Sequence, residues 1–162
     1  MSPPAVADVR PTPEVVLARG RVVLPPVRVD YLRRTHRVGS VLYTPGVLPY
    51  AGEELRFVGR LKEEVGLQDA AEAARLCSLN ILSVVRTILG SLDRVSRVRQ
   101  LNVLVRADAF DGGEPRVADA ASAVLYEVFG ESGRHRREVL ATADLPQGAV
   151  VQVSAVLELT LN

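Results

Sequence analysis

The chain has 162 residues, enough for one domain with its own core, and its 48% hydrophobic content argues against intrinsic disorder. A formal net charge of +1 gives no general attraction to nucleic acid or membranes, and no apolar run reaches the ~18 residues of a membrane span. A single cysteine, Cys77, cannot form an internal disulfide, so we expect a cytoplasmic protein. Lys62 is the only lysine among 20 basic residues, which is typical of a GC-rich bacterial genome.

The N-terminal region is expected to be irregular. Residues 1–13 contain four prolines and no hydrophobic period, which predicts a flexible arm ahead of a single domain over residues 14–162. β-Branched and aromatic residues then predict short strands. These strands are expected at Arg21–Leu24, Arg37–Thr44 and, after a turn at Leu48–Gly52, Leu55–Gly59.

The rest of the chain alternates helices with longer strands. Apolar residues recur with a period of 3.6 over Leu67–Leu89, and Gly90 is placed to end that helix. A second helix is expected between Pro115 and Gly130. Further strands are predicted at Val95–Arg106, Arg137–Ala143 and Ala149–Leu161. The order predicts an α+β fold of two layers, one mainly antiparallel sheet backed by two helices.

Several strings within this order resemble the Rid/YjgF family, which is named for its enamine and imine deaminases. The strings are Tyr43–Pro49, Glu72–Asn80, Leu92–Val95, Val117–Ser122, Glu127–His135 and Asp144–Pro146. The resemblance covers roughly residues 27–160 and is strongest to the branch described as chorismate-mutase-like, of which this chain looks like a divergent member. It implies a homotrimer with three equivalent sites in clefts between subunits.

The resemblance also implies site residues. Family members use an arginine nine residues before the proline of a Leu-Pro turn to hold a substrate carboxylate, and that position is Arg137. A guanidinium suits the task because it donates two parallel hydrogen bonds to a carboxylate. Tyr31 matches a tyrosine that lines the same cleft, and Gly46 would offer a backbone group at its mouth.

The departures from the family pattern concern the same cleft. Deaminating members carry a glutamate that activates water, whereas this chain has Gln152, whose amide cannot act as a general base. Val47 and Val139 replace polar residues and would make the pocket more apolar. Pro45 and Ser154 are further departures. The cleft is thus expected to keep its anchor, Arg137, and to lack its base.

Other features weigh against further sites. Arg94, Arg97 and Arg99 could indicate nucleic acid, but acidic residues balance the arginines and no stacking aromatics lie between them, so nucleic-acid binding is not expected. Two distant histidines and one cysteine do not make a metal site, and neither a metal nor a cofactor is expected. His135 is expected at the surface or at a helix end, and Glu138 should face away from Arg137.

Three functions stay open on this basis. In the first, an imine or enamine hydrolase, Arg137 would hold a carboxylate while Gln152 orders the attacking water. The second is a repurposed biosynthetic enzyme, such as a cyclase, isomerase or tautomerase, in which Gln152 would polarise a carbonyl. The third is a non-catalytic trimer that binds a small molecule.

Overall fold

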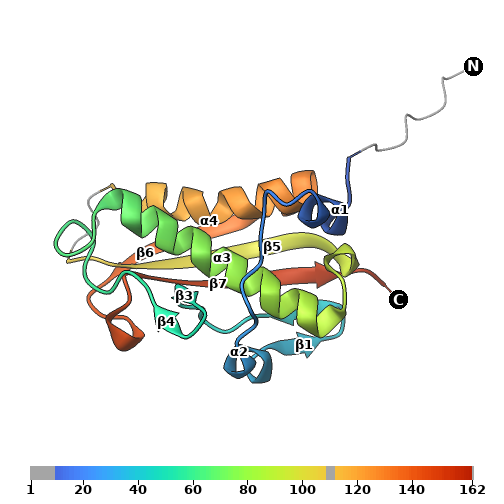
Figure 1. Cartoon of the computed structure of the whole chain (residues 1–162), viewed down its shortest axis with the longest axis horizontal. Coiled ribbons are helices and arrows are strands. Elements are labelled where there is room, and N and C mark those ends of the chain that lie inside the picture. Colours follow the sequence, from blue (N-terminus) through green and yellow to red (C-terminus); the bar gives the residue numbers. More distant parts are fainter. Residues whose placement is uncertain (1–9, 109–111, 162) are drawn as a thin grey trace, which may run out of the picture.

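Two long helices, α3 (Leu67–Leu89) and α4 (Glu114–Phe129), cover one face of a five-stranded sheet (Figure 1). The strands follow in the order β1 (His36–Val38), β2 (Val41–Tyr43), β7 (Val151–Leu159), β5 (Val95–Arg106) and β6 (Arg136–Thr142). Only β5 and β6 pair in parallel, with α4 as their crossover helix. The computed structural model describes residues 10–108 and 112–161, and it confirms the predicted two-layer α+β fold.

The core lies between the sheet and these helices. Alternate residues of β7, among them Val151 and Val153, are completely buried on the helix side. Cys77 lies in the buried stripe of α3 and is also completely buried. Gly90 ends α3 in the left-handed conformation, with a φ of 82°, which glycine adopts without steric cost. The apolar residues that recur every 3.6 positions in the helices therefore pack against the alternate apolar residues of the strands, in one core layer.

No helix of the described parts of the chain covers the other face of the sheet, which we call the open face. It carries both amide and aliphatic side chains. The Gln100 amide donates to Asn102 Oδ1 at 2.7 Å, and the Asn102 amide donates to Ser154 Oγ at 3.3 Å. Leu140 on β6 is 57% exposed among these polar groups. A hollow of about 310 Å³ on this face reaches Gln152. The two long helices of the chain leave this face uncovered.

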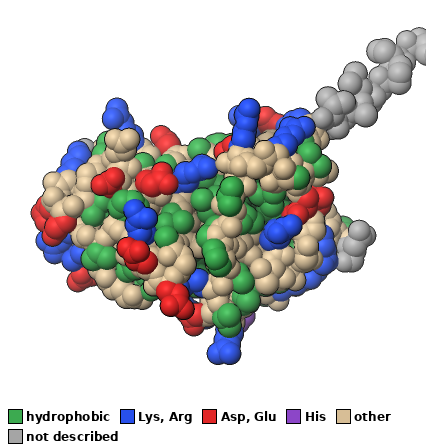
Figure 2. All heavy atoms as spheres, in the orientation of Figure 1, with side chains coloured by type: hydrophobic (Ala, Val, Ile, Leu, Met, Phe, Trp, Pro, Cys, Tyr) green, Lys and Arg blue, Asp and Glu red, His purple; other side chains and the backbone are tan. Residues whose placement is uncertain are grey.

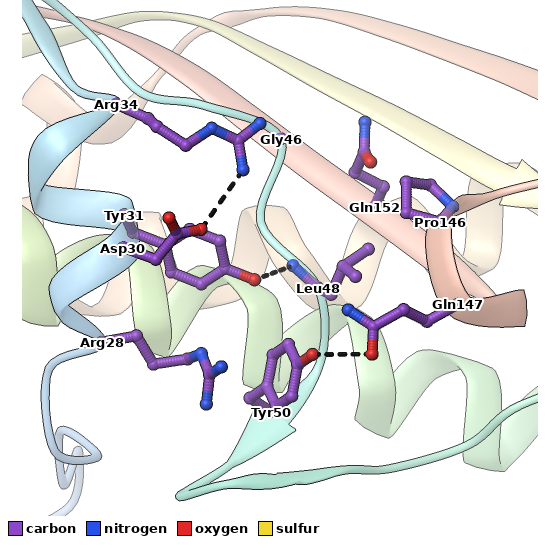
Figure 3. Close-up of a pocket in the computed structure, with 10 residues that line it drawn as sticks. All are labelled: Arg28, Asp30, Tyr31, Arg34, Gly46, Leu48, Tyr50, Pro146, Gln147 and Gln152. Atoms are coloured by element: carbon purple, nitrogen blue, oxygen red, sulfur yellow. Dashed lines mark hydrogen bonds and ion pairs between the residues drawn. The ribbon is translucent and has the colours of Figure 1, made fainter.

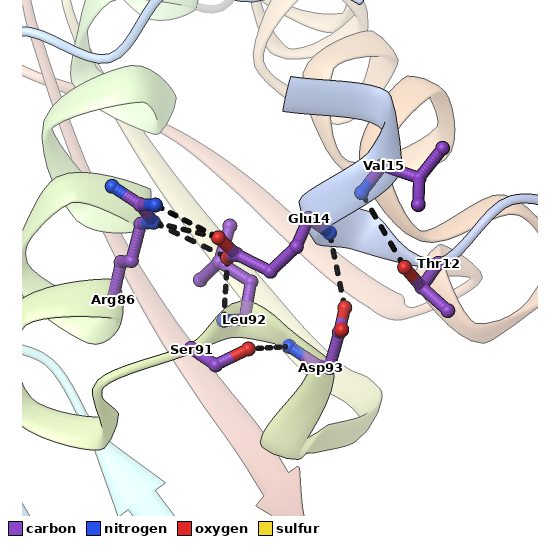
Figure 4. A network of polar contacts seen from close by, with 7 residues as sticks. All are labelled: Thr12, Glu14, Val15, Arg86, Ser91, Leu92 and Asp93. Carbon is purple, nitrogen blue, oxygen red and sulfur yellow. Dashed lines mark hydrogen bonds and ion pairs between the residues drawn. The ribbon is translucent and has the colours of Figure 1, made fainter. Parts of the chain in front are cut away.

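A short helix, α1 (Pro13–Ala18), is anchored by a polar network (Figure 4). The Glu14 carboxylate accepts from Arg86 at 2.8 and 3.0 Å and from the backbone N–H of Leu92 at 2.9 Å. Burial would raise the pKa of Glu14, but these hydrogen bonds outweigh it and lower that pKa. Of the predicted arm, residues 1–9 lie outside the described residues, and Thr12 and Pro13 form the start of α1.

The predicted N-terminal strands need correction. Arg21–Leu24 forms no strand, because the following Pro25 and Pro26 remove two consecutive backbone donors. The stretch Arg37–Thr44 is the β1–β2 hairpin and not one strand, since Gly39, with a φ of 61°, allows a tight reversal.

The next predicted turn and return strand are also shifted. Part of the expected turn Leu48–Gly52 is a strand, β3 (Tyr50–Ala51), which pairs with β4 (Glu54–Leu55). Of the expected strand Leu55–Gly59, only Leu55 lies in β4, and Val58 makes an isolated bridge to Ala149.

The remaining elements are short. They are the helix α2 (Val29–Arg33) and three 3-10 turns, η1 (Leu92–Arg94), η2 (Gly130–Gly133) and η3 (Pro146–Gly148). The two predicted helices and the three later strands lie where the sequence placed them, within two residues at each end. Over residues 10–108 and 112–161, none of the helices is both long and apolar enough to cross a bilayer.

Candidate functional site

A pocket of about 160 Å³ lies between α2, the segment after β2, and the turn before β7 (Figure 3). It brings together three residues that the sequence singled out, Tyr31, Gly46 and Gln152. Seven further residues line it: Arg28, Asp30, Arg34, Leu48, Tyr50, Pro146 and Gln147. Most of these are polar, so the pocket suits a small polar ligand.

Tyr31 connects α2 to the wall of the pocket. Its ring is almost fully buried, and its hydroxyl oxygen accepts a hydrogen bond from the backbone N–H of Leu48 at 3.1 Å. Burial raises the pKa of this phenol, so the hydroxyl keeps its proton at neutral pH. That proton can be donated to a ligand oxygen, because the Leu48 bond uses only the acceptor side of the group.

Gly46, in the segment after β2, lies close to the side chain of Gln152 on β7. A Cβ at position 46 would overlap the side-chain amide of Gln152, so only glycine leaves that amide where it lies. The only carboxylate among the lining residues is Asp30, whose Oδ2 lies 3.5 Å from Nη1 of Arg34. The structure therefore places an amide, and no unpaired carboxylate, at the floor of the pocket.

Arg28, Tyr50 and Gln147 also line the pocket, although their roles were not predicted from the sequence. The Arg28 guanidinium lies 3.6 Å above the centre of the Tyr50 ring, and the Tyr50 hydroxyl donates to Gln147 Oε1 at 2.9 Å (Figure 3). One signal was available for Arg28, which precedes Tyr31 by three residues and so lies one helical turn away. Tyr50 and Gln147 are 97 residues apart and gave no such signal.

Arg137 lies elsewhere in the subunit. On the edge strand β6 it pairs with Leu101, whose side chain is fully buried under the helices. Its Nη1 donates to Asp119 Oδ1 at 2.8 Å and to Ser122 Oγ at 3.2 Å, both on α4. Gln152 pairs with Leu104 on the opposite face. One subunit therefore does not bring the predicted anchor, Arg137, to the predicted water-binding amide.

His135 and Arg137 share a hydrogen-bond partner, the Ser122 hydroxyl. Its Nδ1 donates to the carbonyl oxygen of Gly133 at 2.6 Å, so its Nε2 accepts from the Ser122 hydroxyl at 2.9 Å. Burial lowers the pKa of His135, and its ring stacks on Tyr126 with the ring centres 5.3 Å apart. It is half-buried and lies two residues beyond η2, in keeping with the expected position at a helix end, and through Ser122 it orients the Arg137 guanidinium.

Two predicted pocket residues lie outside the pocket. Val47 is completely buried, its backbone exchanges hydrogen bonds of 2.7 and 3.0 Å with Val153, and it does not line this pocket. That Val47 shapes a cleft between two copies of the chain stays a prediction. Val139 is partly buried on the same side of β6 as Arg137 and packs against the core. Glu138 faces the opposite way and is exposed, as predicted.

Within the described parts of the chain, no three His, Cys, Asp or Glu side chains lie close enough together to hold a metal ion. Apart from the Asp30 carboxylate, the polar groups that line the pocket are guanidinium, amide and phenol groups, all of which can donate hydrogen bonds to oxygen atoms.

The fold and these contacts define the class, a small α+β protein of the chorismate-mutase-like type. The chain belongs to the YjgF family, since residues 20–159 match the family model described as "YjgF/chorismate_mutase-like, putative endoribonuclease". This membership supports a role in processing small molecules.

Known relatives agree with this assignment. Protein TCP17 of Trypanosoma cruzi is 38% identical over 122 residues, covering 75% of this chain and 76% of that protein. A structure from Shewanella oneidensis MR-1 with the same endoribonuclease description has a TM-score of 0.84 and 29% identity, covering 92% of this chain and 100% of its own. The protein Atu1372 from Agrobacterium tumefaciens, of unknown function, has a TM-score of 0.82 and 31% identity, covering 93% of both chains.

Proposed function

We propose that the chain is a homotrimer that acts on an enamine, an imine or a related carbonyl metabolite in clefts between its subunits. In each cleft, Arg137 of one subunit faces the pocket of its neighbour, which contains Gln152. The observation that carries this proposal is that the two residues point to opposite faces of the same sheet. A site that contains both therefore needs two copies of the chain.

The surfaces that would meet are suited to assembly. Arg137 lies on β6, an edge strand, where a neighbouring subunit can approach its side chain. The open face carries the partly exposed Leu104 and the exposed Leu140 beside the amides, and the helices of the same subunit cannot cover it. Burying such a mixed face against a second copy removes apolar area from water and gives the amides new partners.

The chemistry follows from the groups present. Arg137 would bind the substrate carboxylate, giving up or sharing its present contact with Asp119. The Gln152 amide can orient a water molecule or polarise a carbonyl, but it has no proton to exchange. General base catalysis typically contributes ~10²–10⁴ in rate, so hydrolysis of an imine should be slow.

A second candidate is a non-hydrolytic reaction on the same scaffold, such as isomerisation, tautomerisation or cyclisation. One observation favours it: the single carboxylate that lines the pocket, Asp30, is ion-paired with Arg34. The remaining alternative is a trimer that binds a ligand without converting it, and it would show affinity for a ligand but no product.

We do not extend the endoribonuclease description to this chain. Of the three arginines that could have indicated nucleic acid, Arg97 lies 3.8 Å from the carboxylate of Glu158. Basic and acidic side chains alternate over the helix-covered face (Figure 2). Binding of RNA depends on neutralising many phosphates, which a face of mixed charge does poorly.

Mixed trimers test whether the site is shared between subunits. Arg137→Ala removes the anchor, and Gly46→Val blocks the pocket by displacing Gln152. Each variant alone should fail to bind 2-oxobutyrate, a stable oxo acid, in calorimetry. After the two are unfolded and refolded together, every trimer that contains both kinds of subunit regains one intact site.

The expected result is therefore about one bound oxo acid per mixed trimer, with the trimers isolated by two different affinity tags. The matched control is a double variant that carries Arg137→Ala and Gly46→Val in the same chain. Mixed with the wild type, it should add no binding site, because it supplies neither the anchor nor an open pocket. Mixed trimers without any binding, or a wild-type monomer in light scattering at micromolar concentration, would overturn the shared site.

A further inference from the structure

On the basis of the proposed function, we infer that Arg28 is a second anion-binding group, so that the substrate is a dicarboxylic oxo or imino acid. One carboxylate would lie at Arg137 of the adjacent subunit and the other at Arg28 of the subunit that supplies the pocket. The residue at position 28 would then select among oxo acids by charge.

Arg28 is held in place before any ligand arrives. Its guanidinium stacks 3.6 Å above the Tyr50 ring and lies 5.9 Å from the centre of the Tyr31 ring. Its Nη1 donates to the carbonyl oxygen of Gly52 at 2.8 Å. A cation fixed by its flat face and by one nitrogen has already lost its rotamer freedom, so binding an anion costs little further entropy.

Among the residues that the structure describes, the Arg28 guanidinium forms no ion pair. Over the described residues, Arg28 has no carboxylate within ion-pair distance, and its Nε is buried without a hydrogen-bond partner. The other two arginines of the proposed cleft differ, since Arg34 pairs with Asp30 and Arg137 pairs with Asp119. A partly desolvated cation without a counter-ion attracts an anion more strongly than a cation in bulk water does.

The neighbouring groups add donors. Because Gln147 Oε1 accepts from the Tyr50 hydroxyl, the Gln147 amide group turns its nitrogen into the pocket (Figure 3). The Tyr31 hydroxyl, whose oxygen already accepts from Leu48, still has its own proton to donate. Three donors of this kind around about 160 Å³ fit a carboxylate-sized group with several acceptor oxygens.

The test compares two oxo acids that differ by one carboxylate, 2-oxoglutarate and 2-oxobutyrate. Calorimetry on the wild-type trimer should give a dissociation constant at least tenfold lower for 2-oxoglutarate. Arg28→Gln should reduce this ratio to below about twofold, and Arg28→Lys, which keeps the charge without the planar fork, should give an intermediate ratio. Arg56→Gln is the matched control, because Arg56 stacks 5.0 Å from the Phe57 ring outside the pocket and should leave the ratio unchanged.

The outcomes separate this inference from the proposed function. If the wild type binds both acids equally, Arg28 is not a second anchor, whether or not the Arg28 variants fold. If the ratio depends on Arg28 but neither acid responds to Arg137→Ala, the inference holds and the shared cleft is wrong. If neither acid binds the wild-type trimer, both are overturned.

Discussion

The two faces of the sheet differ in what they contribute. Along β5, the side chains of Leu101 and Val103 lie under the helices and are completely buried, whereas Asn102 and Leu104 between them are partly exposed on the open face. One strand thus supplies the core with every second residue and a mixed polar surface with the others. The helix-covered face holds the core of the chain, and the open face is available for the assembly and chemistry that we propose.

The two groups of candidate site residues follow the same division. Arg137 lies at the rim of the helix-covered side, where α4 and His135 orient it through charged and polar contacts. The pocket with Gln152 borders the open face and is held by aromatic rings and backbone groups. A catalytic cleft made from both needs the open face of one copy beside the edge of another.

The largest expected effect compares two leucines of β5. Leu101→Ala should lower the free energy of unfolding by ~2–5 kcal/mol, because it leaves a cavity in a closed core. Leu104→Ala, the same change on the open face, should cost less in dilute protein, and the assembly that we propose should make its effect depend on protein concentration. Urea denaturation at several concentrations measures both. Equal losses at every concentration would show that the faces do not divide these roles.

The next effect concerns the anchor. Arg137→Ala should weaken binding of a carboxylate ligand more than tenfold, or at least ~1.4 kcal/mol, since it removes a charge-assisted contact in a cleft. Arg19→Ala is the control, because Arg19 is an exposed arginine at the end of α1, outside the sheet and both candidate site regions. Calorimetry gives the affinities and thermal denaturation checks the fold. Unchanged affinity in Arg137→Ala would mean that the anchor is misassigned.

The third effect is a gain of function in the pocket. Gln152→Glu should raise hydrolysis of 2-iminopropanoate by about three- to tenfold, because a carboxylate restores part of the general-base contribution. Gln68→Glu makes the same change at an exposed position in the first turn of α3, outside the pocket and the open face, and should not alter the rate. Ammonia release gives the rates. A wild-type rate equal to that of an ordinary Rid deaminase would contradict the importance of this group.

A Gln152→Glu variant that binds the imine but stays inactive would have another meaning. It would favour the non-hydrolytic candidate, in which more of the pocket than one group has changed.

The smallest effect is a dependence of stability on pH. The folded-state pKa of His135 is lowered by burial, so the unfolded chain, with a histidine pKa of about 6.5, takes up a proton first as the pH falls. Stability should therefore be constant above about pH 6.5 and decrease below it. His135→Gln should flatten the change between pH 7.5 and 5.5, measured by urea denaturation. Glu14, whose pKa is lowered from 4.5, loses its contribution only in more acidic solution.

His36→Gln is the control for this prediction, because it removes an exposed imidazole from β1. If the pH dependence of the His135→Gln variant equals that of the wild type, the buried neutral imidazole is not its source.

Those parts of the fold and of the site that depend on contacts between residues close in sequence could be predicted, and those that depend on distant residues could not. The helix Leu67–Leu89 and the strand Val95–Arg106 have the predicted bounds, because each repeats its own period and Gly90 separates them. The β1–β2 hairpin was missed although Gly39 and Ser40, between two β-branched runs, are a two-residue turn signal, because the runs on either side were taken together as one strand. The pocket residue Arg28 was missed because its partner Tyr50 comes from a later strand.

The sequence by itself determined which residues of β6 share a side, since alternation places Arg137 with Val139 and against Glu138. It did not determine which side that is. Only the parallel pairing of β6 with β5 sets Arg137 beside Leu101 and under α4, and only the antiparallel pairing of β7 turns Gln152 to the other face. The reason is physical: a strand carries its own period, but the face that each residue occupies is fixed by the hydrogen bonds and packing of its neighbours.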